Sequence, residues 1–600
     1  MNSKFKSFAL SIWAFMFLVS VQTQGQDQII GMSENIDNVT VETSSQGTTT
    51  QGINTLTQDG FKPNLNAASR FLAQASLGYS FEDIEEVADM GIEDWIDNQI
   101  AMPKSFNLLD KVIEYHNFRR DSLGDPEAGS SIRFWDYAWW QYHVTSDDYL
   151  RQRIAFALSE LLVISRFSNF NNEPYAFSDY YDIFMDHAFG NYRDILTDVT
   201  YHAAMARYLT FMNNPKSDTI ENIFPDENYA REIMQLFTIG LYELNNDGTE
   251  KVDTAGEFIP TYDNDDIAEF SKIFTGLTWG DRTTFGKFYP HDDTSYVVPL
   301  QMFNEYHEPG VKDLLNGFQV PDRVPVDGNA DIDDALDNLF DHPNTGPFVC
   351  RFLIQRLVTS NPSPAYVNRV ASVFNDDGTG TRGNLGAVVK AILLDPIAKS
   401  CNSAIDTTFG MLREPFIRYY QLNRAFDINT MSGNHRNDMY YVQMFVEQKP
   451  NTSPSVFNFF QYDYQPIGSV EQNNLFAPEF QITNSQTITG WINGLYRWVI
   501  NGNPADEYDL YSGEPDSNYE DEIGSLDLSD EELLADDEHL HMLVDRLNLI
   551  LAQGRLSSYT EQVIIDAVKE FDQADAEDLV LRTRLAIYLV MSSPEYLINR

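Results

Sequence analysis

DENYAREIMQLFTIGLYEL, residues 226–244, carries the clearest helical pattern of this chain. On a helical wheel that advances about 100° per residue, its apolar side chains fill one face and its polar side chains fall on a single arc. This polar arc consists of Glu227, Asn228, Arg231, Glu232, Gln235 and Thr238. The stretch therefore predicts an amphipathic helix. Its polar arc is either a solvated face, stabilised by the i,i+4 pair Glu227–Arg231, or the lining of a buried polar network or cleft.

Similar helical patterns recur on both sides of this stretch. They include LRQRIAFALSELLVISR (150–166), IAEFSKIFTGLTW (267–279), FVCRFLIQRLV (348–358) and REPFIRYYQLNRAF (413–426). Ser80 and Asp83 have the spacing of an N-terminal helix cap, and Gly91 can end the helix that they begin. Strand-like alternation is scarce, apart from a short hairpin expected around residues 279–300. We therefore predict a mainly α fold, a large multi-helix domain with few short strands and long loops.

The first 25 residues have the order of a secretory signal peptide. Lys4 and Lys6 precede an apolar run, and the small residues Thr23 and Gly25 follow it. The run is shorter than the roughly 20 apolar residues that a spanning helix needs. We therefore expect cleavage after Gly25, no transmembrane anchor afterwards, and a location in the periplasm, at the cell surface or outside the cell.

The rest of the chain divides by composition into four segments. Residues 26–64 are polar and rich in glycine and threonine, which indicates a flexible leader. Residues 65–500 are predicted to form the main helical domain. Residues 501–538 are acidic and rich in turn residues, which indicates an exposed connection or insertion. Residues 539–600 are predicted to be C-terminal helices that pack on the main domain.

The net charge of −50 restricts the class of partner. Nucleic-acid binding depends on neutralising phosphates with lysine and arginine, so we expect no nucleic-acid partner. Solubility in a salty medium explains the acidity, and calcium binding is the alternative, although no recognisable calcium site exists. The cofactor is therefore left open. Cys350 and Cys401 are the only cysteines, and either a disulfide or a buried free thiol fits Cys350.

Motifs of known chemistry are absent or fail in their context. Gly378–Gly383 matches GxGxxG, but a helical pattern precedes it, so we predict a turn between helices. No GxSxG, HExxH or CxxC motif is present. His307, beside Glu308 and near Lys312, suits a general base or a metal ligand, and equally a structural role. The aromatic run SPSVFNFFQYDYQP (453–466) suits either stacking on sugar rings or the packing of a loop.

An ordered series of segments resembles the bacterial domain of unknown function 1800 family over most of residues 65–600. The series runs RFLAQASLG, LRQRIAFALSELLVIS, DENYAREIMQLFTIGLYEL, IAEFSKIFTGLTW, YHEPGVKDLLNG, RGNLGAVVKAILLDP, SPSVFNFFQYDY, LFAPEFQITN and YLVMSSPEYL. The usual Asn-Glu-Asn-Tyr of the family appears here with Asp226 in first place, and its His-Asp-Pro-Gly turn appears with Glu308 in second place.

The resemblance implies an exported, mostly helical protein, and it brings no established activity. By association it also implies an exported partner of the domain of unknown function 1501 family, which is similar to phosphatases and sulfatases. Our first hypothesis is a scaffold or binding protein for an envelope partner protein or glycan. The alternative is a hydrolase-type enzyme, with or without a metal. Its candidate catalytic residues are Glu227, Asn228, Arg231, Glu232 and His307.

Overall fold

The structure is a computed structural model that describes a large part of the chain. The described residues are 56–57, 60–61, 65–168, 170–287, 289–430, 433–507 and 522–600. The predicted signal peptide (1–25), most of the predicted leader (26–64) and part of the acidic segment (508–521) lie outside the described residues.

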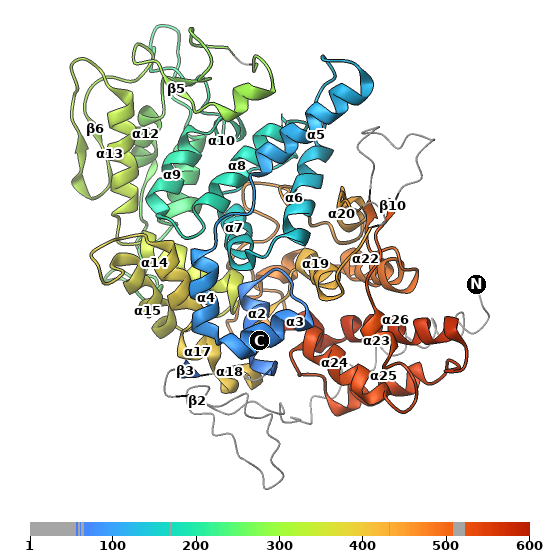
Figure 1. Ribbon diagram of the computed structural model, residues 1–600. Coiled ribbons are helices and arrows are strands. Elements are labelled where there is room, and N and C mark those ends of the chain that lie inside the picture. The colour runs from blue at the N-terminus through green and yellow to red at the C-terminus, as the bar shows by residue number, and fades with distance from the viewer. Residues whose placement is uncertain are drawn as a thin grey trace.

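The fold is mainly α, as predicted (Figure 1). The first helices are α2 (Leu65–Ala75), α3 (Phe81–Met90), α4 (Ile92–Ala101), α5 (Leu108–Leu123), α6 (Arg133–Thr145), α7 (Tyr149–Leu161), α8 (Pro174–Asp186), α9 (Tyr192–Tyr201) and α10 (Ala203–Tyr208). The middle helices are α11 (Asn228–Glu232), the π-helix η3 (Ile233–Thr238), α12 (Asn264–Ile273), η4 (Asp293–Val297), η5 (Leu315–Gly317), α13 (Gly328–Phe340), α14 (Thr345–Leu357), α15 (Pro364–Asn375), α16 (Leu385–Leu393), α17 (Pro396–Lys399) and α18 (Cys401–Ile405).

The last third of the chain is helical as well. Its helices are α19 (Pro415–Ala425), α20 (Tyr440–Val446), α21 (Ser469–Gln472), η6 (Pro478–Ile482), α22 (Ser485–Leu495), the π-helix η7 (Tyr496–Ile500), α23 (Ser529–Glu532), α24 (Leu540–Ala552), α25 (Ser558–Val568), α26 (Ala576–Ser592) and α27 (Pro594–Leu597).

The strands among the described residues are short and pair antiparallel in twos. The pairs are β2 (Leu56–Thr57) with β3 (Gly60–Phe61), β4 (Leu277–Thr278) with β5 (Gln301–Met302), β6 (Lys312–Asp313) with β7 (Gln319–Val320), β8 (Met411–Leu412) with β11 (Ile598–Asn599), and β9 (Asp506–Glu507) with β10 (Glu522–Ile523). The pair β4–β5 is the expected hairpin, with its strands just outside residues 279–300.

Local sequence rules set several helix ends. The side chain of Ser80 accepts the backbone N–H of Asp83, and the Asp83 side chain accepts the N–H of Ser80, which is the capping box of α3. Gly91 ends that helix with a φ of 100°, a region that favours glycine. The stretch 378–383 lies between α15 and α16, as predicted for a turn.

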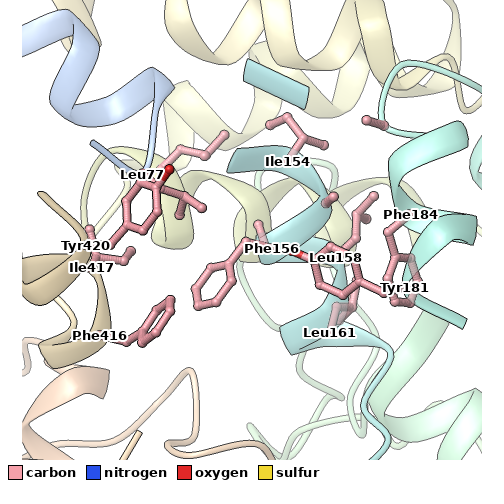
Figure 2. Packing of buried hydrophobic residues seen from close by; sticks show 14 of the residues in the cluster. Leu77, Ile154, Phe156, Leu158, Leu161, Tyr181, Phe184, Phe416, Ile417 and Tyr420 are labelled. Carbon is pink, nitrogen blue, oxygen red and sulfur yellow. The ribbon is translucent and has the colours of Figure 1, made fainter. Parts of the chain in front are cut away.

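Helix α7 lies at the centre of the hydrophobic core. All of its residues except Ser159 are buried, as expected of a helix that other elements surround on every side. Figure 2 shows Phe156 facing Phe416 of α19, with ring centroids 5.8 Å apart, while Leu158 lies with Tyr181 of α8. The charged residues that α7 carries are therefore held inside the protein.

The two ends of the described chain meet. Helix α24 contacts α2 and α19, and α26 contacts η7 and α22. Strand β11, close to the last residue, pairs with β8, and Figure 1 shows this end of the chain beside α2. The helices after residue 538 therefore pack on α2, at the start of the described chain, and also on α19, α22 and η7.

Two further predictions concern single features. Cys350 on α14 is fully buried and free, and burial raises the pKa of its thiol. A buried thiol, rather than a disulfide, is therefore the state of Cys350 in this structure. Across the described ranges, every helix is too short or too polar to cross a membrane.

Candidate functional site

The predicted helix of residues 226–244 is present, but its geometry changes along its length. Helix α11 ends at Glu232, and the π-helix η3 follows directly. In a π-helix the hydrogen bonds span five residues, so a wheel at 100° per residue no longer assigns the faces. Thr238, placed on the polar arc by that wheel, is fully buried, and its hydroxyl donates to the carbonyl oxygen of Ile233 at 2.6 Å.

The start of the polar arc is solvated. Glu227 and Arg231 form an ion pair at 3.4 Å, and their side chains are 51% and 41% exposed. The backbone N–H of Asn228 donates to Asp226 at 2.8 Å, and its side chain donates to Thr210 at 3.4 Å. These three candidate residues therefore support the helix from its surface.

Glu232 and Gln235 have different surroundings from the rest of the arc. Glu232 is only 7% exposed, and its Oε2 atom has no hydrogen-bond partner among the described residues. Burial raises the pKa of its carboxyl group, and the nearby Arg231 opposes that change. Gln235 accepts a hydrogen bond from the hydroxyl of Tyr262 at 3.2 Å and lines a cavity described below.

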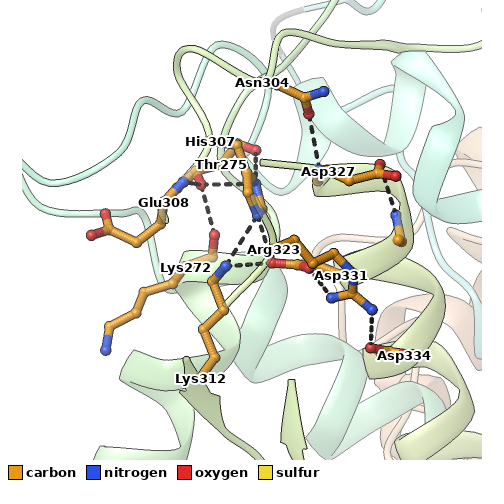
Figure 3. A network of polar contacts seen from close by, with 12 residues as sticks. Lys272, Thr275, Asn304, His307, Glu308, Lys312, Arg323, Asp327, Asp331 and Asp334 are labelled. Carbon is orange, nitrogen blue, oxygen red and sulfur yellow. Dashed lines mark hydrogen bonds and ion pairs between the residues drawn. The ribbon is translucent and has the colours of Figure 1, made fainter. Parts of the chain in front are cut away.

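His307 belongs to a buried polar network of its own (Figure 3). Its Nδ1 lies 2.9 Å from the carbonyl oxygen of Thr275, and its Nε2 lies 3.0 Å from Oδ2 of Asp331. Lys312 and Arg323 also pair with Asp331. Although burial opposes it, the hydrogen bonds from His307 and Lys312 lower the pKa of Asp331.

This network connects the segment after α12 to helix α13. His307 is fully buried, and Asp331 is 2% exposed. Gly328 lets the ring approach closely, because a Cβ atom there would come within 2.9 Å of Cγ of His307. The side chain of His307 has Thr275, Asp331 and Lys312 as its hydrogen-bond and ion partners, and none of these lies on α11 or η3. The structure therefore separates His307 from the other four candidates.

A cavity of about 130 Å³ lies beside the π-helix. Its aromatic lining consists of Phe348, Phe352, Phe457, Phe460 and Tyr462. Helix α14 supplies the first two rings, and the aromatic run 453–466 supplies the other three. The run therefore packs its rings around a cavity, as a packed loop would, and stacking on sugar rings stays a prediction.

The polar lining of the same cavity is sparse. Three amides line it, Gln235, Asn458 and Gln461, together with two carboxyl groups, Glu160 and Asp463. An apolar pocket with a few convergent polar groups is the usual form of a small-ligand site.

The cavity has a buried end and an exposed end. Phe460 and Glu160 are each 5% exposed, whereas Leu241 and Phe457 are 45% and 43% exposed. Leu241 and Phe457 therefore mark the exposed side of the lining, and Phe460 and Glu160 mark its buried side.

Beneath the cavity lies a buried cluster of charged groups around Arg356. Its guanidinium Nη2 donates to Oε1 of Glu479 at 3.1 Å, and its Nη1 lies 3.8 Å from Glu414 and 4.0 Å from Glu160. The same guanidinium lies 4.5 Å from the centre of the Phe460 ring. Arg356 thus joins three carboxyl groups to the wall of the cavity, where it also contributes a cation–π contact.

The charged groups of the cluster are perturbed by burial. Burial raises the pKa of Glu479 to about 7. Burial and then the charge of Glu414 raise the pKa of Glu160 well above its ordinary value, although the charges of Arg356 and Arg153 oppose that change. Gln448 donates to Glu414 at 2.6 Å and holds it in place. Perturbed carboxyl groups next to a pocket are a common feature of functional sites.

Sequence reasoning missed Glu160. It lies in LRQRIAFALSELLVIS, a stretch whose apolar pattern predicts a helix. The available signal was charge inside an apolar helix, because Arg151, Arg153 and Glu160 interrupt a segment that is otherwise suited to the core. Its neighbours Arg356 and Glu414 are remote along the chain, so spacing alone could not reveal them.

A metal site is not evident in the described ranges, where three or more His, Cys, Asp or Glu side chains nowhere come together in a way that could hold an ion. The site is therefore described by its carboxyl groups, arginines, amides and rings. The described residues therefore add no site for the calcium ion that the acidic composition left as an alternative.

The fold and the site define a mainly helical protein with an aromatic cavity above a buried Arg–Glu cluster. The chain belongs to the family described as protein of unknown function (DUF1800), whose model matches residues 70–598. That range includes Glu160, Arg356 and the aromatic run 453–466. No curated protein and no solved structure matches the chain.

Proposed function

We propose that this protein is exported and binds an envelope glycan in the aromatic cavity. The observation that carries the proposal is the composition of the lining, which is five aromatic rings with three side-chain amides. The apolar face of a sugar ring suits aromatic walls, and amides can both donate and accept hydrogen bonds with sugar hydroxyls.

Exposed aromatic side chains beside the entrance support a ligand longer than one sugar ring. Tyr242 and Phe258 are 43% and 54% exposed, and their ring centroids lie 5.3 Å apart. They follow Leu241 of the cavity along a hairpin-like segment, in which Tyr242 bridges to Pro260. Exposed apolar patches next to a pocket are typical of binding surfaces.

Glycan-array binding followed by calorimetric titration of the bound glycans tests the proposal. Phe457→Ala removes an exposed ring from the entrance, and we expect about a tenfold loss of affinity, equal to ~1.4 kcal/mol. Phe318→Ala is the matched control, because Phe318 is 41% exposed and lies outside the cavity lining. A protein that binds no glycan, or an equal loss in the control variant, would refute the proposal.

An exported protein partner is a second candidate, favoured by a different surface. Ile220 and Phe224 are 90% and 67% exposed in the loop before α11. The family resemblance suggests a partner from the domain of unknown function 1501 family. Co-purification from the native cell should recover this partner with the unmodified protein and lose it with Ile220→Ser/Phe224→Ser. If the partner were recovered equally with the unmodified protein and with the double variant, the surface of Ile220 and Phe224 would be excluded as its binding site.

A further inference from the structure

A pattern of eight residues occurs three times between the end of η3 and the start of α12. The three repeats are LYELNNDG (241–248), TEKVDTAG (249–256) and EFIPTYDN (257–264). Backbone hydrogen bonds join them in a ring. The N–H of Glu243 donates to the carbonyl oxygen of Ile259 at 2.8 Å, the N–H of Ile259 to that of Lys251 at 3.1 Å, and the N–H of Lys251 to that of Glu243 at 2.7 Å. The repeats therefore surround a pseudo-threefold axis.

Equivalent positions in the three repeats hold Tyr242, Glu250 and Phe258. The β-bridge between Leu244 and Glu250 recurs eight residues later between Val252 and Phe258, which agrees with this equivalence. All three equivalent side chains are exposed. The rings of Tyr242 and Phe258 are tilted by 45° to each other, with their centroids 5.3 Å apart. Two rings and one carboxyl group therefore form a surface that we call the platform.

The platform continues the lining of the cavity through two connections. Leu241, which lines the cavity, directly precedes Tyr242. Arg351 of α14 lies 5.7 Å from the ring centre of the cavity residue Tyr462, and its Nη1 lies 3.9 Å from Oε1 of Glu250. A ligand that extends from the cavity over this side therefore meets two rings for stacking, with a carboxyl group and a guanidinium for hydrogen bonds to its hydroxyls.

The charges around the cavity and the platform disfavour an anionic ligand. The described residues that line the cavity include Glu160 and Asp463 but no lysine, arginine or histidine. In the three repeats, one basic residue, Lys251, stands against the acidic residues Glu243, Asp247, Glu250, Asp253, Glu257 and Asp263. With a net charge of −50 on the whole chain, a polyanion and a second copy of this protein are both repelled. An uncharged chain meets no such barrier.

We propose that the platform is an outer subsite for an uncharged glycan chain whose inner part occupies the cavity. The inference rests on the proposed function, because the chain is the glycan that the cavity binds. Tyr242 and Phe258 stack on a sugar farther along this chain, and Glu250 accepts hydrogen bonds from its hydroxyls. Once the inner part is bound, the outer contact is intramolecular, so a chain that reaches both places binds more tightly than a short one.

The first test measures affinity against chain length. The wild-type protein is titrated calorimetrically with uncharged cello-, manno- and N-acetylchito-oligosaccharides of two to six sugars. In a series that binds, we expect the hexasaccharide to bind about tenfold more tightly than the disaccharide, because only the longer chain reaches the platform. Oligogalacturonates of the same lengths carry a carboxylate on each sugar and should not bind measurably.

The second test removes the rings of the platform. Tyr242→Ala and Phe258→Ala should each weaken hexasaccharide binding about threefold to tenfold and leave disaccharide binding unchanged. Tyr242→Phe keeps the ring and should bind both lengths as the wild type does. Tyr559→Ala is the matched control, because Tyr559 is 67% exposed on α25 and lies outside the cavity and the platform. Losses that are equal for both lengths would overturn the inference.

Failure of the inference differs from failure of the proposed function. A wild-type protein that binds disaccharides as tightly as hexasaccharides, or that prefers oligogalacturonates, overturns the inference and leaves glycan binding in place. Binding to array glycans without binding to any of the three uncharged series does the same. A protein that binds no glycan of either kind overturns both.

Discussion

Removal of Arg356 should destabilise the protein strongly. It is 1% exposed and faces Glu479, Glu414 and Glu160 at 3.1, 3.8 and 4.0 Å. Arg356→Met keeps much of the side-chain volume but leaves Glu479 without the guanidinium that donates to it. Removing one partner of a buried ion pair costs about 3–5 kcal/mol, because the remaining charge is neither solvated nor paired.

The assay is urea unfolding at pH 7, followed by tryptophan fluorescence. We expect the free energy of unfolding to fall by about 3–5 kcal/mol with an unchanged m-value. Arg231→Met is the matched control. Its ion pair with Glu227 is 41% and 51% exposed, so solvent screening limits the loss to about 0.3–0.5 kcal/mol.

A double variant separates unpaired charge from lost packing. Glu479→Gln removes the carboxylate that Arg356 neutralises, so Arg356→Met/Glu479→Gln should be less destabilised than the sum of the two single variants. The reasoning is refuted if Arg356→Met costs less than about 1 kcal/mol, or if the two losses add without coupling.

Three further predictions concern stability and reactivity. Ser80→Ala should lower the free energy of unfolding by about 1 kcal/mol, because the N-cap of α3 is lost, and thermal unfolding measures this. Cys350 should not react with Ellman's reagent in the native protein and should react fully in guanidinium, since its thiol is buried and has a raised pKa. Burial raises the pKa of Glu479 from 4.5 to about 7, so the folded state binds more protons than the unfolded state across this interval. Stability should therefore fall as pH rises from about 4.5 to about 7, and Glu479→Gln should flatten that slope in urea titrations. If Glu479→Gln left the dependence of stability on pH unchanged, the raised pKa of Glu479 would be contradicted.

Features that depend on neighbouring residues could be predicted from the sequence. The capping box of Ser80 and Asp83 follows from a spacing of three residues. The ion pair of Glu227 and Arg231 follows from i,i+4 geometry. The mainly α fold follows from repeated apolar periodicity, which is a property of each helix by itself.

Features that depend on distant residues could not be predicted. The Arg356–Glu479 hydrogen bond joins residues 123 positions apart, and no periodicity relates them. His307 and the polar arc looked equally suitable as site residues, yet only the fold decides that His307 pairs with Asp331. The aromatic run was recognised, but its role as a cavity wall depends on α14 and α7. The change to a π-helix after Glu232 follows from no rule applied to the sequence.

The π-helix η3 has a consequence for how this segment can vary in length. The hydrogen bonds of η3 span five residues, whereas those of an α-helix span four. The turn between α11 and Gly240 therefore holds one residue more than an α-helical turn would. Deleting one residue from 233–238 would remove this additional residue and restore α-helical bonding, while the residues that follow keep their places. The wide turn itself would be lost, and Gln235 and Leu236, which lie on it, would meet the cavity differently. A deletion of one residue is therefore expected to preserve the fold and to change the wall of the cavity.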